Sequence, residues 1–189
     1  MNLATKDIEL RPASDGDLQI LYKWRNADSY RALFQNRRNV ISPEEFRVEY
    51  KRDVERQRHV QFMIVLKKSN EPIGLIYSYN ASMVDGYVFM GIYMDDKFQN
   101  RGYGAKASIL FIKHLFDTYP IHKICLEIFS YNTMSFPGCQ KLGFVKEGEL
   151  VRQRFYFGKH WNVIRLALFR ENTAKVNSLF KKLTSEVVN

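Results

Sequence analysis

The stretch that decides the fold of this chain reads Ile92-Tyr93-Met94-Asp95-Asp96-Lys97-Phe98-Gln99-Asn100-Arg101-Gly102-Tyr103-Gly104-Ala105. An apolar strand ends within it, a polar turn follows, and two glycines one residue apart open a helix. Such a turn aims several backbone N–H groups at one point, and the helix dipole favours negative charge there. Glycine adopts positive φ and lets a phosphate approach the backbone closely. The stretch therefore predicts a pyrophosphate-binding turn.

Two better-known phosphate-binding motifs do not fit this turn. A Walker loop requires Gly-Lys-Ser/Thr, which does not follow here. The dinucleotide fingerprint requires a third glycine, but Lys106 and Ala107 supply none, and no acidic residue stands at the expected ribose distance. The pattern Gly-x-Gly before a helix also occurs in turns that bind no ligand. The surrounding elements therefore have to show whether this turn binds a pyrophosphate.

Those elements predict one mixed α/β domain. Apolar, β-rich runs predict strands at Ile8–Arg11, Val60–Lys67, Pro72–Tyr79, Tyr87–Met94, Lys123–Phe129, Phe144–Phe157 and Trp161–Phe169. Helical periodicity separates them at Ser14–Asn26, after Ser42, at Gly102–Tyr119, at Asn132–Leu142 and in the tail. The order is β-α-α-β-β-β-α-β-α-β-β.

Capping signals support the first two helices. Ser14 with Asp17, and Ser42 with Glu45, each form a capping-box pattern. The second helix is predicted to bury a stripe of every fourth residue, Phe46, Tyr50 and Val54. Residues 28–40 between the two helices predict a basic loop.

Length and composition limit the class of protein. A chain of 189 residues with 46% hydrophobic residues suits one domain with a sizeable core. We expect one domain at residues 1–170 and an amphipathic tail helix at 171–189. The N-terminus lacks a signal-peptide pattern, and no window is apolar enough to span a bilayer. Two cysteines without metal-ligand spacing favour a reducing compartment, so a soluble, cytoplasmic protein without a metal is expected.

The net charge of +9 favours anionic partners such as nucleotide-bearing ligands, RNA or an acidic surface. A solubilising surface charge explains the same excess. The aromatic pattern of RNA-binding modules is absent from the sequence, so no direct nucleic-acid partner is required.

Two motifs at a fixed separation resemble a known family. Gln99-x-x-Gly102-x-Gly104 after an apolar strand resembles the signature of the GNAT superfamily of acyl-CoA-dependent N-acetyltransferases. The segment from Asn132 to Lys141-Leu142-Gly143-Phe144 resembles its second signature. Leu10-Arg11-Pro12 and Trp24-Arg25-Asn26 resemble the branch that contains ribosomal-protein and spermidine acetyltransferases. The resemblance implies an α+β fold: a single mixed, mostly antiparallel twisted sheet flanked by helices.

The resemblance also implies that acetyl-CoA is the co-substrate. Backbone N–H groups in the turn would hold the pyrophosphate, and the pantetheine arm would lie between two splayed strands, Tyr87–Met94 and Lys123–Phe129. The residues implied in this site are Ile92, Met94, Gln99, Asn100, Arg101, Gly102, Tyr103, Gly104, Ala105, Asn132 and Lys141.

The acid that protonates the departing thiolate is one departure from the family. Many relatives carry a tyrosine at the position of Cys139. A thiol can protonate a thiolate, and a small buried apolar residue is the alternative role. Tyr131, Ser135 or water remain alternative donors. Pro137-Gly138 nearby predicts that the short helix is broken or begins late.

The base is the other departure, because Phe89 stands where the family usually has a glutamate. Glu127 on the neighbouring strand is the remaining candidate, acting directly or through water. An outward, salt-bridging role is the alternative for Glu127. Asp85 and Asp95 are weaker candidates because both lie in predicted turns.

The acceptor is predicted to be a primary amine on a protein N-terminus or on a small molecule such as an amino sugar, aminoglycoside or polyamine. Trp24, Phe34 and Tyr156 are the predicted contacts, with arginines close in sequence at 31, 37, 38, 152 and 154. These basic surroundings argue against a polyamine. A non-catalytic CoA-binding module is the alternative function, and the aromatic last hairpin and tail predict a possible homodimer.

Overall fold

A seven-stranded mixed sheet forms the centre of the computed structural model, which describes residues 3–33, 39–56, 58–133 and 135–185. The strand order is β1-β2-β3-β4-β5-β7-β6. The strands are β1 (Ile8–Arg11), β2 (Arg58–Leu66), β3 (Glu71–Ser82), β4 (Tyr87–Met94), β5 (Lys123–Phe129), β6 (Val145–Tyr156) and β7 (Lys159–Phe169). The helices are α1 (Leu18–Arg25), α2 (Asp28–Leu33), α3 (Pro43–Arg56), α4 (Tyr103–Thr118), α5 (Ser135–Leu142) and α6 (Ala174–Ser185).

The predicted fold class is confirmed. Neighbouring strands pair antiparallel, except for β4 and β5, which pair parallel and are joined by the crossover helix α4. The bounds of β4 and β5 equal the predicted ones. These two strands have apolar runs bounded by clear turn signals, and such runs are the easiest to delimit from sequence.

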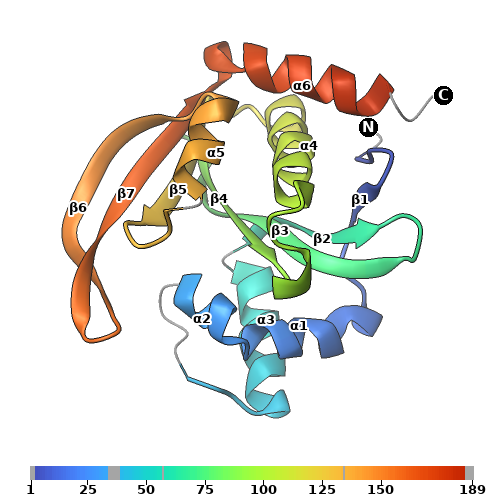
Figure 1. The fold of residues 1–189 in the computed structure, drawn as a ribbon, viewed down its shortest axis with the longest axis vertical. Coiled ribbons are helices and arrows are strands. Elements are labelled where there is room, and N and C mark those ends of the chain that lie inside the picture. Colours follow the sequence, from blue (N-terminus) through green and yellow to red (C-terminus); the bar gives the residue numbers. More distant parts are fainter. Residues whose placement is uncertain (1–2, 34–38, 57, 134, 186–189) are drawn as a thin grey trace.

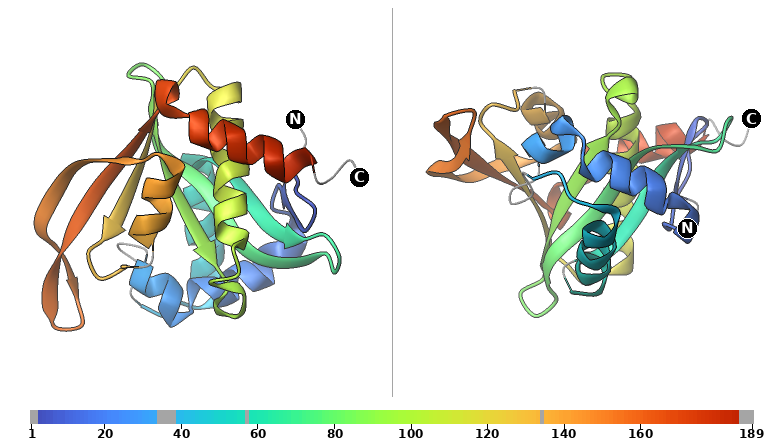
Figure 2. Two further views of the ribbon diagram at one scale, coloured as in Figure 1. Left: turned by 45° about the horizontal axis from the view of Figure 1, so that its top comes forward. Right: turned by 90° about the horizontal axis from the view of Figure 1, so that it is seen from below.

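The helices divide between the two faces of the sheet (Figures 1 and 2). Helices α4, α5 and α6 lie on one face, where Val88 and Met90 of β4 join a core cluster with the apolar side of α4. Helices α1, α2 and α3 lie on the other face, where Tyr77 and Tyr93 join a second cluster with Trp24. Because side chains alternate along a strand, the central strands contribute residues to both clusters.

The β4–β5 pair separates part-way along its length. Within these fully described strands, the paired residues are Tyr87 with Lys123, Val88 with Ile124, and Phe89 with Cys125. Residues 90–94 of β4 and 126–129 of β5 continue without pairing to each other, while β3 and β7 pair with their outer edges. The sheet therefore has a gap between its central strands, and this gap runs from Met90 to the end of β4.

Two predictions about the N-terminal helices are wrong. Part of the expected basic loop is helix α2, which begins at Asp28 and ends at Leu33. Val54 is 41% exposed, whereas Asp53 is 1% exposed. A period of four drifts from the helical period of 3.6, so the position seven residues after Phe46 faces inward and the position eight after it does not.

The predicted capping boxes are present. The Asp17 carboxylate accepts hydrogen bonds from the Ser14 backbone N–H at 2.8 Å and from its hydroxyl at 2.9 Å, at the start of a 3-10 turn that leads into α1. At α3, the Glu45 N–H donates to Ser42 Oγ at 3.2 Å and the Ser42 N–H donates to the Glu45 carboxylate at 2.8 Å. These bonds satisfy donors that a helix start leaves unpaired.

Helix α5 begins late, as the proline predicts. It starts at Ser135, so Pro137 falls in the first turn, where a missing N–H removes no intrahelical bond. Helix α6 follows β7 and packs on α4 through Val176, which is 1% exposed. The division of the chain at residue 170 stays a prediction. Among the described residues, no helix has both the length and the apolarity needed to cross a bilayer.

Candidate active site

A cavity of about 450 Å³ occupies the gap between β4 and β5. Its lining comes from both faces of the sheet: Met90 and Leu126 belong to the cluster under α4, whereas Tyr77 and Tyr30 belong to the cluster under α1–α3. The cavity therefore passes through the sheet. We call its two parts the α5 half and the α3 half, after the helices that line them.

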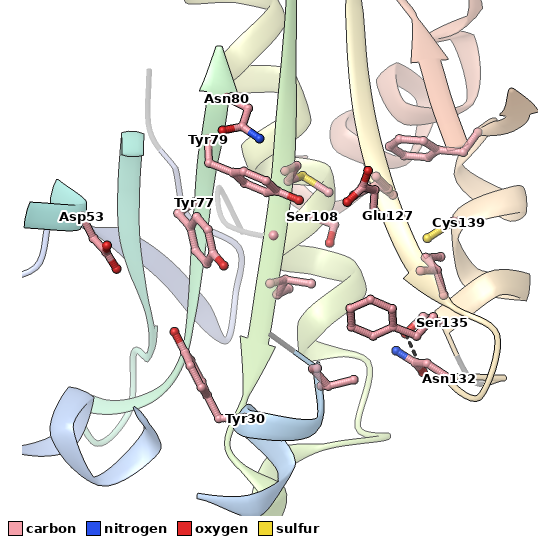
Figure 3. Close-up of a pocket in the computed structure, with 18 of the residues that line it drawn as sticks. Tyr30, Asp53, Tyr77, Tyr79, Asn80, Ser108, Glu127, Asn132, Ser135 and Cys139 are labelled. Atoms are coloured by element: carbon pink, nitrogen blue, oxygen red, sulfur yellow. Dashed lines mark hydrogen bonds between the residues drawn. The ribbon is translucent and has the colours of Figure 1, made fainter. Parts of the chain in front are cut away.

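The α5 half is mainly apolar. Its lining residues from the α4 and α5 side are Met90, Ile92, Ser108, Leu126, Ile128, Asn132, Ser135, Cys139, Leu142 and Phe144. Three of the residues predicted for the cofactor or the thiol end, Ile92, Asn132 and Cys139, thus lie together here (Figure 3). The Ser135 hydroxyl donates a hydrogen bond to Asn132 Oδ1 at 3.1 Å, which fixes the polar end of this half.

The α3 half carries the charged and phenolic groups. Its lining residues are Tyr30, Leu33, Glu49, Arg52, Asp53, Tyr77, Tyr79, Asn80, Glu127 and Phe129. Gly91 of β4 lies between the halves, and a Cβ there would meet the Tyr77 ring at 2.9 Å and its hydroxyl at 3.0 Å. Glycine at this position lets the Tyr77 ring lie flat against β4 and keeps the gap open.

The glycine turn leads from the open end of β4 into α4. Gly102 has a φ of 82°, in the left-handed region that glycine adopts without strain, and it caps the helix. Gln99 Nε2 donates to the Met94 carbonyl at 3.2 Å and to the Asp96 carboxylate at 2.8 Å, which ties the turn to the end of the strand. The turn residues Gln99, Asn100, Arg101, Gly102 and Ala105 are exposed.

This turn fits a pyrophosphate group. The first N–H groups of an α-helix have no intrahelical acceptor, and α4 has sixteen residues to sustain its dipole. A Cβ on Gly102 would meet no atom within 4 Å, so the space over the turn is open to a ligand. Met94 packs against the first turn of α4, with Cγ 3.5 Å from the place of a Gly104 Cβ. The predicted cofactor turn is thus continuous with the strand that lines the cavity.

Cys139 is a half-buried thiol in the α5 half. Burial raises its pKa to about 11. The side chain therefore keeps its proton at neutral pH, which suits a proton donor or an apolar wall and not a nucleophile. Tyr131, an alternative donor in the sequence, is not among the lining residues, and its hydroxyl donates to the Ala32 carbonyl of α2. Ser135 does line the cavity.

Glu127 both lines the cavity and forms an ion pair. It lines the cavity, and its Oε1 also accepts from Arg165 at 2.6 Å, with 14% of the glutamate side chain exposed. Because Leu126 and Ile128 belong to the cluster under α4, Glu127 between them points to the opposite face, into the α3 half. Glu127 and Cys139 thus lie in different halves of one cavity (Figure 3).

The charge around the α3 half differs from the predicted basic surroundings. Glu49, Asp53 and Glu127 line the cavity, against one lining arginine, Arg52. Arg154 is 3% exposed and donates to carbonyls at the end of α2, outside the cavity lining. The prediction of an arginine-rich pocket is therefore wrong for the described arginines, and carboxylates predominate in the α3 half.

Two predicted substrate contacts that the structure describes, Trp24 and Tyr156, lie outside the cavity lining. Trp24 is 2% exposed and donates from Nε1 to the Asp95 carboxylate at 2.8 Å, so it supports the turn after β4 from within the core. Tyr156 stacks on Tyr131 with ring centroids 5.0 Å apart, on the β6–β7 hairpin. Lys141 is exposed on α5, and Phe34, Arg37 and Arg38 lie outside the described residues.

Several lining residues were not predicted, above all Tyr77, Tyr79, Glu49 and Asp53. A correct helical phase in α3 would have indicated the two carboxylates, since positions 46, 49, 50 and 53 share one face. Tyr77 and Tyr79 carry no such signal, because they resemble ordinary members of an apolar strand.

A model of the acetyltransferase (GNAT) domain matches residues 7–145. The chain belongs to the GNAT acetyltransferase family. It is an N-acetyltransferase that uses acetyl-CoA as the acetyl donor, and both family signatures lie on the walls of the cavity or lead into it.

Relatives of this acetyltransferase are similar over most of their length. The spermidine N(1)-acetyltransferase of Escherichia coli K12 is 26% identical over 168 residues, which are 86% of each chain. The crystal structure of Vibrio cholerae spermidine N-acetyltransferase with CoA and spermine superposes with a TM-score of 0.81 at 20% identity, covering 88% of this chain and 97% of that one. A ribosomal L7/L12 α-N-protein acetyltransferase with CoA gives 0.77 at 16% identity, covering 89% and 98%.

Proposed function

We propose that the protein acetylates a cationic primary amine, and that its two substrates enter from opposite faces of the sheet. The observation that carries this proposal is the cavity itself, which passes through the β4–β5 gap and is apolar in one half and rich in carboxylates in the other. Acetyl-CoA would occupy the α5 half and the glycine turn, and the amine would occupy the α3 half.

The acetyl-CoA side rests on backbone donors and an apolar channel. The N–H groups of residues 101–105 would hold the pyrophosphate at the start of α4, and the unpaired edge of β4 from Met90 to Met94 would bind the pantetheine arm as an added strand does. Ile92 and Asn132 line that path. When bound, acetyl-CoA supplies the activated acetyl carbonyl at the gap.

Glu127 is proposed as the group that takes the proton of the attacking amine. An amine must lose a proton before or as its nitrogen forms the bond to the acetyl carbon, and a carboxylate within hydrogen-bond reach provides the acceptor. Glu127 points into the α3 half at the start of the gap, where the amine would arrive.

Cys139 is proposed as the proton donor on the other face. As the carbon–sulfur bond breaks, the sulfur gains an electron pair and takes the Cys139 proton. The Cys139 pKa of about 11 makes it a weak acid. The departing sulfur is buried in the same half, however, and its proton affinity rises for the same reason, so transfer between two sulfurs there costs little.

The amine is proposed to be cationic before it reacts, and a polyamine fits best. Asp53 of α3 lines the α3 half beside Glu49, which pairs with Arg25 at 2.6 Å, and Tyr30 and Tyr77 line the same space. Carboxylates and tyrosine faces both favour an ammonium group. Relatives named for spermidine acetylation support this class over a protein N-terminus.

The test is a thiol-release assay with acetyl-CoA against spermidine, N-terminal peptides, aminoglycosides and amino sugar nucleotides. We expect turnover of polyamines, and a loss of about 10²-fold or more in kcat for Glu127→Gln. Glu147→Gln is the matched control, since Glu147 pairs with Lys123 at 2.9 Å on the same side of the sheet and does not line the cavity. Turnover confined to peptides would overturn the polyamine assignment, and acetyl-CoA binding without turnover of any amine would indicate a non-catalytic CoA-binding module.

Three further expectations stay predictions: a homodimer, a cytoplasmic location and no requirement for nucleic acid. The edge strand β6, with Val151 72% exposed, supports a dimer interface.

A further inference from the structure

A row of four side chains crosses the sheet where the β4–β5 gap begins. Tyr79 of β3 is the register partner of Phe89 of β4, which is the last β4 residue paired to β5. Glu127 of β5 lies two residues beyond that last pair and is the register partner of Arg165 of β7. All four belong to the face of the α3 half.

Contacts along this row are close. Arg165 Nη2 donates to Glu127 Oε1 at 2.6 Å, and its guanidinium carbon lies 5.2 Å from the centroid of the Phe89 ring. The rings of Tyr79 and Phe89 lie 5.5 Å apart. The Tyr79 hydroxyl points across β4 towards Glu127 (Figure 3), and burial together with the charge of Glu127 raises the pKa of Tyr79.

We propose that Arg165 and Tyr79 are positioning residues that hold the Glu127 carboxylate at the start of the gap. This inference rests on the proposed function of Glu127 and names what makes that function possible. Arg165 holds one oxygen of the Glu127 carboxylate, and the face of the Phe89 ring packs against the Arg165 guanidinium. Tyr79, on the other side of Phe89, restricts the space into which the carboxylate can turn.

The row explains why Phe89 can replace a carboxylate on β4. The aromatic face stabilises a cation placed over it, and a planar guanidinium suits this position better than an ammonium group. Because the ring supports Arg165, the negative charge of the site is supplied from β5 instead of β4. A carboxylate at residue 89 would compete with Glu127 for the same guanidinium.

Other titratable groups face Glu127 from the surrounding strands. Cys125 lies two residues earlier on the same face of β5, and burial raises its pKa to about 11, so it stays neutral. Tyr79 also stays protonated. Lys123 and Glu147 form their own pair at 2.9 Å. Arg165 is therefore the cation that pairs with the Glu127 carboxylate. Arg52, Glu49 and Asp53 of α3 line the same half, and Glu49 pairs with Arg25 at 2.6 Å.

The experiment is a double-mutant cycle on the full-length protein with acetyl-CoA and its best amine. Arg165→Gln should lower kcat about tenfold with little change in KM for acetyl-CoA, and should cause no further loss in the Glu127→Gln background, because residues that act as one unit are not additive. Arg165→Lys should restore part of the rate. Lys123→Gln, which removes the neighbouring ion pair outside the cavity, should change neither constant.

The split between kcat and KM separates positioning from mere structural support. A misplaced Glu127 carboxylate slows the chemical step, so Arg165→Gln should lower kcat without raising KM for the amine. Tyr79→Phe should lower kcat by less than Arg165→Gln and leave KM for acetyl-CoA unchanged. An equal rate loss for Arg165→Gln in both backgrounds would overturn the proposal.

A readout without turnover keeps the two proposals distinct. Carboxyl-detected NMR of glutamate-labelled protein, with Glu127 assigned by its absence in Glu127→Gln, reports the surroundings of this carboxylate directly. Its chemical shift at neutral pH should change in Arg165→Gln and stay in place in Lys123→Gln. A chemical shift unaffected by Arg165→Gln contradicts the positioning role, whereas failure of every amine to react contradicts only the proposed function.

Discussion

The two halves of the cavity are built in different ways. The glycine turn and the β4 wall of the α5 half follow one continuous run of chain, from Ile92 through Gly102 into α4, and depend largely on backbone groups. Strand β5 and helix α5 complete that half. The α3 half is assembled from α2, α3, β3 and β5, and depends on side chains such as Asp53 and Glu127. Under the proposed function, a local motif would therefore recognise the acetyl donor, whereas tertiary packing would build the site for the acceptor.

This comparison predicts that changes in one half affect one substrate only. The largest effect is expected for Asp53→Asn, which keeps the shape of a side chain that is 1% exposed and removes its charge. Loss of a charge-assisted contact of about 1.5–3 kcal/mol corresponds to a rise of about 10- to 100-fold in KM for the amine. The constants are measured by steady-state kinetics with each substrate varied in turn.

Glu55→Gln is the matched control for Asp53→Asn, because Glu55 is an exposed carboxylate on the same helix, 3.9 Å from Lys51. It should leave both KM values unchanged. A comparable rise in KM for acetyl-CoA in Asp53→Asn would break the division into two halves.

A smaller effect is expected in the other half from Gly102→Ala. A side chain on a residue with φ of 82° is strained by about 1–2 kcal/mol, and relief of that strain turns the N–H groups away from the ligand. We expect acetyl-CoA binding, measured by calorimetry, to weaken about tenfold, which is the fold-change for about 1.4 kcal/mol. The KM for the amine should not change.

Gly158→Ala separates backbone strain from ligand binding. Gly158 has a similar φ of 74° and equally open surroundings, but it lies in the β6–β7 turn. The variant Gly158→Ala should lower the melting temperature as Gly102→Ala does, and its affinity for acetyl-CoA should equal that of the wild type. Equal loss of affinity in both variants would show that the glycine turn has no special role.

The smallest effect on function is expected from a group in neither half. The hydrogen bond from Arg11 to Asp17, at 2.7 Å, and the bonds from Ser14 lower the Asp17 pKa to about 2. Because the folded pKa lies below the unfolded value, this contribution of about 2 kcal/mol is present above about pH 4 and is lost as the pH falls through about 2. Chemical denaturation across this range measures it.

In Asp17→Asn, the free energy of unfolding should fall by a similar amount at pH 7, and the difference from the wild type should shrink in acid. Asp15→Asn, an exposed neighbour, is the control. Both KM values should stay as in the wild type. A change in either would mean that α1 affects substrate binding through the packing of Trp24 or Arg25.

The sequence was sufficient for the elements with strong local signals. The bounds of β4 and β5, the capping boxes at Ser14 and Ser42, and the glycine turn each follow from a few adjacent residues. Cys139 and Glu127 were identified as candidates by comparing the chain with a family pattern, and both line the cavity. Their chemical roles stay predictions.

The remaining features depend on contacts that a sequence pattern does not contain. Helix α2 is held by tertiary contacts, with the Tyr30 ring 5.1 Å from that of Tyr93 and Ser29 Oγ 3.2 Å from the Tyr93 hydroxyl. A six-residue helix has little stability of its own. Trp24 was predicted to contact the substrate because aromatic residues suit a pocket, yet the packing against Tyr93 places it in the core.

A crystal structure of the protein with CoA and the preferred amine bound together would show directly whether the two substrates meet through the sheet. We expect the CoA sulfur on the α5 side next to Cys139, and the amine nitrogen on the α3 side within about 3 Å of Glu127 or one water away. The two ligands should approach each other through the gap between β4 and β5. Both ligands on one face of the sheet, or an amine bound away from Glu127, would contradict this arrangement.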